Sequence, residues 1–284
     1  MKIKGLIAGL IAVTVLAGCG DTTSVNSHGG EVITTVKLGV VGAVYEELWE
    51  PAKEALIEEN IKLELIQFSD YVTPNNALAN GEIDLNAFQH KIYLDTEIEN
   101  YGYQIEVVGN TFIIPLNLYS KKVSSVDEIT DGATIAIPND LTNGGRALKV
   151  LEGAGLIVLS ESSNFSPTVD DIEKFNVDIE IIELSANTIP SSLEDVTAAI
   201  INGNFALDFG IKTEEAIFKD ISLTEENYWN LIAVKSSDLE DAAKVEVYRK
   251  VVDAYQREAT EALFDSEYGG YFIKAGWGIN YLSK

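Results

Sequence analysis

The chain has 284 residues, of which 46% are hydrophobic and 23% are charged, a mixture typical of globular proteins. It carries 45 Asp and Glu against 20 Lys and Arg, giving a formal net charge of −25. Because nucleic-acid binding depends on basic patches that neutralise phosphates, this balance argues against a nucleic-acid partner. The length suffices for one large α/β domain or two smaller lobes.

The first eighteen residues have the pattern of a secretory signal peptide. Lys2 and Lys4 form a positive start, and the apolar run over 5–18 is too short for a stable transmembrane helix. The sequence Leu-Ala-Gly-Cys at 16–19 resembles the lipobox of bacterial lipoproteins. That resemblance implies cleavage before Cys19, the only cysteine in the chain, and a lipid on its sulfur and amino group. The alternative interpretations are an uncleaved anchor or an incidental free thiol.

Residues 19–35 are expected to form a flexible tether behind this lipidated cysteine. From 21 to 35 the sequence is rich in Ser, Thr, Gly and Asn and shows no hydrophobic period. His28 lies in this stretch, and we expect it to be exposed and inert. The protein is thus expected to sit on the extracytoplasmic face of the cell membrane, held there only by its lipid.

A first cycle of strands and helices follows. It contains runs of β-type residues, helical spacing of apolar residues, and short connections. This alternation predicts a mostly parallel sheet with helices on both faces. The expected strands are 36–41, 62–67, 83–85, 104–108 and 112–119, and the expected helices are 45–59, 74–80 and 93–101.

A second, similar cycle begins after Lys122, and the chain then returns with a strand over 230–234 and a long amphipathic helix over 242–264. Two α/β halves with a closing segment predict two lobes joined by two crossing strands, near 115–120 and 228–234. The first lobe is expected to comprise 36–115 plus 229–284, and the second 116–228. Within the second cycle we expect strands at 133–138, 156–159, 179–184 and 198–201, helices at 146–153, 169–175 and 191–196, and a polar loop at 139–145.

Ligands of open α/β sheets bind beyond the carboxyl ends of the strands. In the first lobe this rule selects an aromatic set interleaved with neutral amides, which suits a small, partly apolar molecule. That set contains Tyr71, Phe88, His90 and Tyr93, with Asn75, Asn76, Asn86 and Gln89 between them. The simpler alternatives are that these rings are ordinary core packing and that His90 is a structural histidine.

In the second lobe the same rule selects a polar set: Asn139, Asn143, Arg146 and Asn202. An arginine near a helix N-terminus suits a carboxylate or another small anion. The ligand is therefore expected to have an apolar part and an anionic part. The alternatives are that Arg146 is a surface arginine starting a helix, and that Asn202 and Asn230 only cap or end strands.

Enzyme chemistry has little support, because no cysteine nucleophile is available and a second ordered histidine for a metal site or triad is missing. We therefore expect no catalytic residue, no cofactor and no metal. Two other interpretations of the same chain remain open: a metal-binding importer subunit, and a surface lipoprotein that acts in adhesion rather than uptake.

Several motifs together resemble the methionine-binding lipoproteins of bacterial ABC importers, the NlpA-type substrate-binding proteins. The similarity extends over nearly the whole mature chain. The motifs are FSDYVTPN at 68–75, GEID at 81–84, FQH at 88–90, YLD at 93–95, GATIAIPND at 132–140, RAL at 146–148 and AGLI at 154–157, together with Asn143 and Asn230.

The resemblance implies a two-lobed periplasmic-binding-protein-like fold of type II. It implies a lipid-anchored monomer that closes on L-methionine or a close relative, such as D-methionine or a methionyl dipeptide, and docks on a permease and ATPase complex. On matching positions, the family's aromatic pocket falls on Tyr71, Phe88, His90 and Tyr93. Its carboxylate-binding arginine falls on Arg146, with Asn143 beside it, and its head-group amides fall on Asn202 and Asn230.

Four places depart from the family's pattern. Residues 41–46 read VGAVYE where a Pro-Gly-Pro-His-like stretch is usual, and Ile92 replaces a proline. Leu116-Asn117 replaces a Met-Gly pair, and Asn204 stands near the family's amide site. These departures alter the rim of the first lobe and leave open another apolar amino acid as the ligand.

Overall fold

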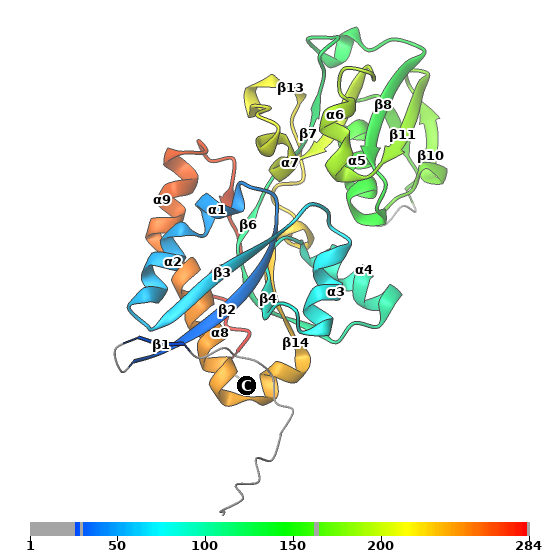
Figure 1. Ribbon diagram of the computed structural model, residues 1–284. Coiled ribbons are helices and arrows are strands. Elements are labelled where there is room, and N and C mark those ends of the chain that lie inside the picture. The colour runs from blue at the N-terminus through cyan, green and yellow to red at the C-terminus, as the bar shows by residue number, and fades with distance from the viewer. Residues whose placement is uncertain (1–25, 29–30, 162–164, 283–284) are drawn as a thin grey trace, which may run out of the picture.

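The computed structural model describes residues 26–28, 31–161 and 165–282, and Figure 1 shows two α/β bodies, each around its own sheet. We call the body with the six-stranded sheet the first lobe, and the body with the five-stranded sheet the second lobe. No helix of the described residues is long and apolar enough to cross a membrane. The predicted signal peptide, Cys19 and most of the predicted tether lie outside the described residues.

Two strands lie where we expected only a flexible tether. β1 (Asn26–His28) pairs antiparallel with the start of β2 (Glu31–Val41), with Ser27 opposite Val32. The tether prediction is therefore wrong for these residues. The β-branched residues of 32–36 continue the pattern of the strand that follows, and such residues fit a pleated sheet whatever polar residues accompany them.

The first sheet has the order β3-β2-β4-β14-β5, with β1 at the edge of β2. β2 runs parallel to β3 (Ile61–Phe68) and to β4 (Leu85–Asn86). β14 (Leu231–Lys235) is inserted antiparallel between β4 and β5 (Ile105–Asn110), so the returning chain completes the first lobe.

Helices cover both faces of this sheet (Figure 1). One face carries α1 (Tyr45–Leu48), α2 (Glu50–Ile57), α8 (Ala242–Tyr255) and α9 (Glu258–Ser266). The other face carries α3 (Thr73–Asn80) and α4 (Lys91–Tyr101).

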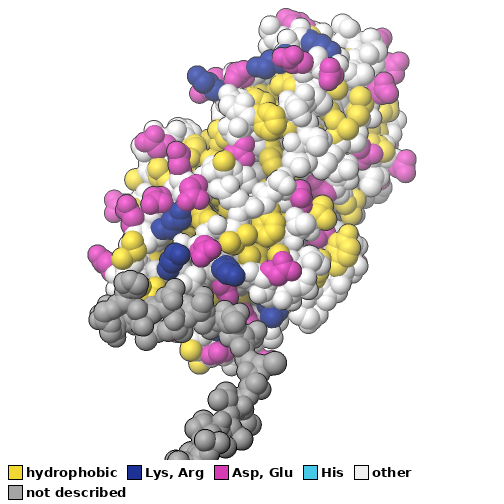
Figure 2. Space-filling model, viewed as in Figure 1, with side chains coloured by type: hydrophobic (Ala, Val, Ile, Leu, Met, Phe, Trp, Pro, Cys, Tyr) yellow, Lys and Arg dark blue, Asp and Glu magenta, His cyan; other side chains and the backbone are white. Residues whose placement is uncertain are grey.

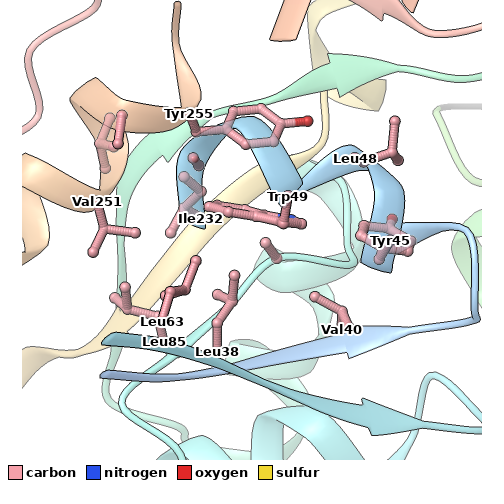
Figure 3. Close-up of a cluster of buried hydrophobic side chains, with 14 of the residues drawn as sticks. Leu38, Val40, Tyr45, Leu48, Trp49, Leu63, Leu85, Ile232, Val251 and Tyr255 are labelled. Atoms are coloured by element: carbon pink, nitrogen blue, oxygen red, sulfur yellow. The ribbon is translucent and has the colours of Figure 1, made fainter. Parts of the chain in front are cut away.

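The core under α1, α2 and α8 centres on Trp49, whose ring lies 4.3 Å from that of Tyr255 (Figure 3). The single helix predicted over 242–264 is wrong, because the chain breaks between α8 and α9. Arg257 is extended there, with φ −116° and ψ 159°, which starts the new helix in a different direction.

The second sheet has the order β11-β8-β12-β7-β13. β8 (Ala133–Pro138) lies parallel between β11 (Ile179–Leu184) and β12 (Ala198–Asn202), while β7 (Leu116–Tyr119) runs antiparallel to β12 and to β13 (Ala216–Phe218). Its helices are α5 (Leu141–Gly153), α6 (Ile189–Ser192) and α7 (Gly203–Asp208).

Two predictions for the second lobe are wrong. Residues 141–145 are not a loop, because Asp140 caps α5 by accepting a hydrogen bond from the Asn143 N–H at 2.9 Å. The helix predicted over 169–175 is only a turn, η2 (Val169–Asp171). It is followed by β10 (Ile172–Phe175), which pairs with β9 (Ile157–Leu159). Thr168 and Asp171 form a capping box, but it caps only this one turn.

The chain crosses between the lobes at two short connections. The first is 114–115, between β6 (Phe112–Ile113) and β7. The second lies between β13 and β14. β6 pairs with β15 (Ile273–Lys274) in the first lobe. The two strands predicted to cross do not themselves span both lobes. β7 belongs to the second sheet and β14 to the first, and the connections beside them make the crossings. The exact lobe boundaries stay a prediction.

The surface in Figure 2 carries many acidic side chains, with few Lys and Arg between them. This distribution matches the net charge of −25. Charge of one sign keeps a protein soluble but does not specify its fold.

Candidate functional site

Both lobes contribute to one pocket where they meet, beyond the carboxyl ends of β3, β4, β8 and β12. All eight side chains selected from the sequence line it: Tyr71, Phe88, His90, Tyr93, Asn143, Arg146, Asn202 and Asn230. The cavity between these side chains has a volume of about 30 Å³, which is room for about two water molecules. A larger guest therefore requires the walls to move apart.

Several further lining residues were not selected from the sequence as ligand contacts: Tyr45, Ile114, Pro115, Leu116 and Gly203. Tyr45 follows the carboxyl end of β2, so the strand-end rule that selected the others applies to it as well. Ile114 and Pro115 form the first crossing, whose position became clear only with the two sheets in place.

An aromatic wall forms the first-lobe side. The ring centres of Tyr71, Phe88 and Tyr93 lie 6.0–6.2 Å apart. The Tyr93 hydroxyl donates to the Tyr71 carbonyl at 3.0 Å, which fixes one ring on the backbone of the other. Phe205 of the second lobe lies 5.0 Å from Tyr71, so the wall spans both lobes. These rings pack in the hydrophobic core and also line the pocket. The core interpretation and the pocket interpretation therefore both apply to them.

His90 presents a hydrogen-bond donor to the pocket. It caps α4, and its Nδ1 accepts from the Tyr93 N–H at 3.1 Å. A neutral imidazole that accepts at Nδ1 carries its proton on Nε2. Nε2 is buried and forms no well-aligned hydrogen bond with a described residue, although the Asn143 side chain lies close to the imidazole. A buried donor without a partner is costly, and a bound ligand would remove that cost.

The pKa of His90 is lowered to about 3, first by burial and then by the positive charge of Arg146. The imidazole is therefore neutral at pH 7, and Nε2 is a neutral donor rather than a charged one. His90 therefore offers the pocket a fixed, neutral N–H donor, while Arg146 supplies the positive charge.

This pKa predicts an acid-sensitive fold. The folded pKa is about 3, whereas an unfolded histidine titrates near 6.5, so the unfolded chain binds the extra proton and stability falls as the pH drops from about 6.5 towards 3. Between pH 6.5 and pH 5 the loss should be at most about 2 kcal/mol. Urea unfolding of wild type and His90→Gln at both pH values measures it. A decline of equal size in the two proteins would contradict the assignment.

The amides Asn75, Asn86 and Gln89 are buried and bond one another. Asn75 donates to the Gln89 oxygen at 2.8 Å, and its own oxygen accepts from Asn86 at 2.9 Å and from Gln89 at 2.7 Å. Asn75 and Asn86, which the sequence placed among the pocket rings, do not line the pocket, whereas Gln89 does. Because Gln89 lies between Phe88 and His90, the network holds both pocket side chains in place.

An acceptor on the second-lobe side complements the His90 donor. Asn143, in the first turn of α5, donates to the Asp140 carboxylate at 3.1 Å and accepts from the Asn202 amide at 2.8 Å. One of the two Asn202 N–H donors is thereby occupied, and its Oδ1 is buried without a partner in the described part of the chain. An acceptor of this kind suits an ammonium group.

Arg146 is buried, so the interpretation as a surface arginine is wrong. Its Nη2 pairs with the Asp220 carboxylate and donates to the Ile114 carbonyl at 3.0 Å. Nε donates to the Ser222 hydroxyl at 3.0 Å, and the guanidinium lies 4.5 Å from the Tyr228 ring centre. Nη1 makes no hydrogen bond to a described residue, and Arg146 lines the pocket.

Over the described ranges, no group of three or more His, Cys, Asp and Glu side chains is arranged to hold a metal ion. The polar atoms of the pocket are amides, an imidazole and a guanidinium. Such a set suits a small organic molecule that carries both signs of charge.

Comparison with known proteins gives a consistent set of relatives. Residues 36–276 match the family model described as NlpA lipoprotein. The probable D-methionine-binding lipoprotein MetQ of Vibrio cholerae is 39% identical over 273 residues, which is 95% of this chain and 96% of the relative. The D-methionine-binding lipoprotein MetQ of Escherichia coli K12 is 37% identical over 280 residues, 97% of this chain and 98% of the relative.

A solved structure shares the architecture. A nutrient binding protein from Burkholderia cenocepacia, bound to methionine, superposes with a TM-score of 0.78 at 35% identity and covers 85% of this chain and 100% of its own. The prediction of a two-lobed, periplasmic-binding-protein-like α/β fold is confirmed.

Proposed function

The chain belongs to the NlpA lipoprotein family, and from that premise we propose that it is the substrate-binding protein of an ABC importer for methionine or a close relative. It binds and releases its ligand and catalyses no reaction. Lipid on Cys19 would hold it at the extracytoplasmic face of the cell membrane, where it delivers the ligand to a permease and its ATPase.

The observation that carries this proposal is the opposed pair of unpartnered buried atoms, the His90 Nε2–H donor and the Asn202 Oδ1 acceptor. With the open Nη1 of Arg146 they match the two ends of an amino-acid head group. The donors suit the carboxylate, and the acceptor suits the ammonium. Asn230 lies beside them on the pocket wall and adds a further amide.

The aromatic wall of Tyr71, Phe88 and Tyr93 supports a sulfur-containing side chain. A thioether gains about 0.3–1.5 kcal/mol from each favourable contact with an aromatic ring. The rings and the polar atoms line the same pocket, so one methionine can contact both sets at once.

Binding by lobe closure follows from the position of these groups. The rings and His90 lie on the first lobe, whereas Asn143, Arg146 and Asn202 lie on the second. A ligand that contacts both sets stabilises the closed state over the open one. The small free space, about 30 Å³, fits a closed arrangement that must open for entry.

Titration calorimetry of residues 20–284 tests the proposal. We expect heat of binding at one site per chain with L-methionine, D-methionine or Gly-Met, and less or none with amino acids that lack an apolar side chain. 3-(Methylthio)propionate lacks the ammonium group and should bind more weakly than methionine. The absence of heat with every methionine derivative would contradict the ligand assignment.

A further inference from the structure

The helix α7 of the second lobe contacts the first lobe through its last residue. Asp208 accepts two backbone hydrogen bonds across the lobe interface: Oδ2 from the Ala43 N–H at 3.0 Å and Oδ1 from the Val44 N–H at 3.0 Å. These N–H groups precede α1, which has no side-chain cap of its own. A carboxylate of the other lobe therefore accepts the hydrogen bonds of the free N–H groups at the start of this helix.

Asn204, four residues before Asp208, makes a second pair of interlobe contacts from the same helix. Its Nδ2 donates to the Val41 carbonyl at 3.1 Å, and its Oδ1 accepts from the Tyr71 hydroxyl at 2.5 Å. Residues four apart lie on one side of a helix. One side of α7 thus contacts the chain beyond both β2 and β3, where the pocket lies.

The approach at Gly42 is too close for a side chain. Its φ is +104°, a conformation that residues with a Cβ rarely adopt, and an added Cβ would lie 2.4 Å from the Asp208 Oδ2. The backbone of the first lobe is therefore shaped to receive this carboxylate.

The segment held by Asp208 leads directly into the pocket. Tyr45 follows Val44, is 3% exposed and lines the pocket. Its ring also packs on Phe112, with 6.0 Å between ring centres. The position of Asp208 thus bears on a pocket side chain that it does not itself touch through a hydrogen bond.

We propose that Asp208 is a positioning residue for ligand binding. It fastens the start of α1 to α7 when the lobes close, and it thereby holds Tyr45 in the pocket and slows ligand release. The carboxylate belongs to one lobe and the two N–H groups to the other, so separation of the lobes breaks both hydrogen bonds. This role deepens the proposed function and rests on it for the effect on release.

A fluorescence experiment tests this with residues 20–284 labelled in both lobes, through cysteines at the exposed positions Glu58 and Glu173. Asp208→Ala is compared with Asp208→Asn, which keeps one carbonyl oxygen as an acceptor. The control is Asp178→Ala, because Asp178 is exposed in the second lobe and its side chain makes no hydrogen bond to a described residue.

We expect Asp208→Ala to lower energy transfer between the lobes in the absence of ligand. L-Methionine should leave about tenfold faster, with little change in the association rate, because two hydrogen bonds to a charged group are lost from the closed state. Energy transfer and the release rate of Asp208→Asn should lie between those of wild type and Asp208→Ala. Asp178→Ala should match wild type in both.

Unchanged transfer and unchanged release in Asp208→Ala would overturn the proposal. If that variant does not fold, the same two measurements on Asp208→Asn decide, and wild-type values there overturn it equally. If wild type binds no methionine derivative, the proposed function fails separately, while the transfer values of the ligand-free proteins still decide whether Asp208 holds the lobes together.

Discussion

Replacing Arg146 with alanine is expected to abolish methionine binding and to lower the free energy of unfolding by about 3–5 kcal/mol. The stability loss arises because Asp220 is buried and pairs with the guanidinium, so the substitution leaves a carboxylate unpaired in the interior. From the sequence alone we would expect the fold to stay intact, since a surface or pocket arginine has no such partner.

Urea unfolding and calorimetry on the same samples measure the two effects. The double variant Arg146→Met/Asp220→Asn removes both buried charges, and the amide oxygen can still accept from the Leu116 N–H, which now bonds Asp220 at 2.9 Å. It should recover much of the stability, because removing a whole buried pair costs far less than removing one partner. Binding should stay lost. Recovery of binding in the double variant would mean that Arg146 does not hold the ligand.

Replacing Trp49 with alanine should lower the free energy of unfolding by about 3–5 kcal/mol as well, through the cavity left in the first lobe. The side chain is fully buried and stacks on Tyr255, among the residues shown in Figure 3. Trp49 does not line the pocket. The folded variant should therefore bind methionine with close to wild-type affinity.

Trp49→Phe is the matched control, because it keeps an aromatic ring in the site and should cost less than alanine. Calorimetry well below the unfolding transition compares all three proteins with Arg146→Ala. We expect Trp49→Ala and Arg146→Ala to have similar stability, and only Trp49→Ala to bind methionine. A large loss of affinity in folded Trp49→Ala would show that general destabilisation is enough to impair the pocket.

The strand-end rule selected side chains that meet in one pocket, because they follow the carboxyl ends of β3, β4, β8 and β12 in the two lobes. Side chains just beyond those ends had to meet if the two halves face each other. Tyr45 follows the carboxyl end of β2 and lies in the 41–46 stretch that departs from the family's pattern, so the same rule applies to it.

Partners far apart in sequence could not be predicted. Asp220 follows Arg146 by 74 residues and lies in a stretch with no periodic pattern, so nothing in the sequence pairs its carboxylate with Arg146. The amides around Gln89 offered donors and acceptors, but composition cannot tell whether such groups bond a ligand or one another. Both cases require the folded chain, because burial decides which polar groups must be satisfied internally.

A crystal structure of residues 20–284 with L-methionine tests the central claim most directly. We expect the methionine carboxylate within hydrogen-bond distance of Arg146 Nη1 and His90 Nε2, and its ammonium group at Asn202 Oδ1. Its sulfur should lie against Tyr71, Phe88 and Tyr93. A methionine bound elsewhere, or bound here with its sulfur at Arg146 and its head group against the rings, would contradict it.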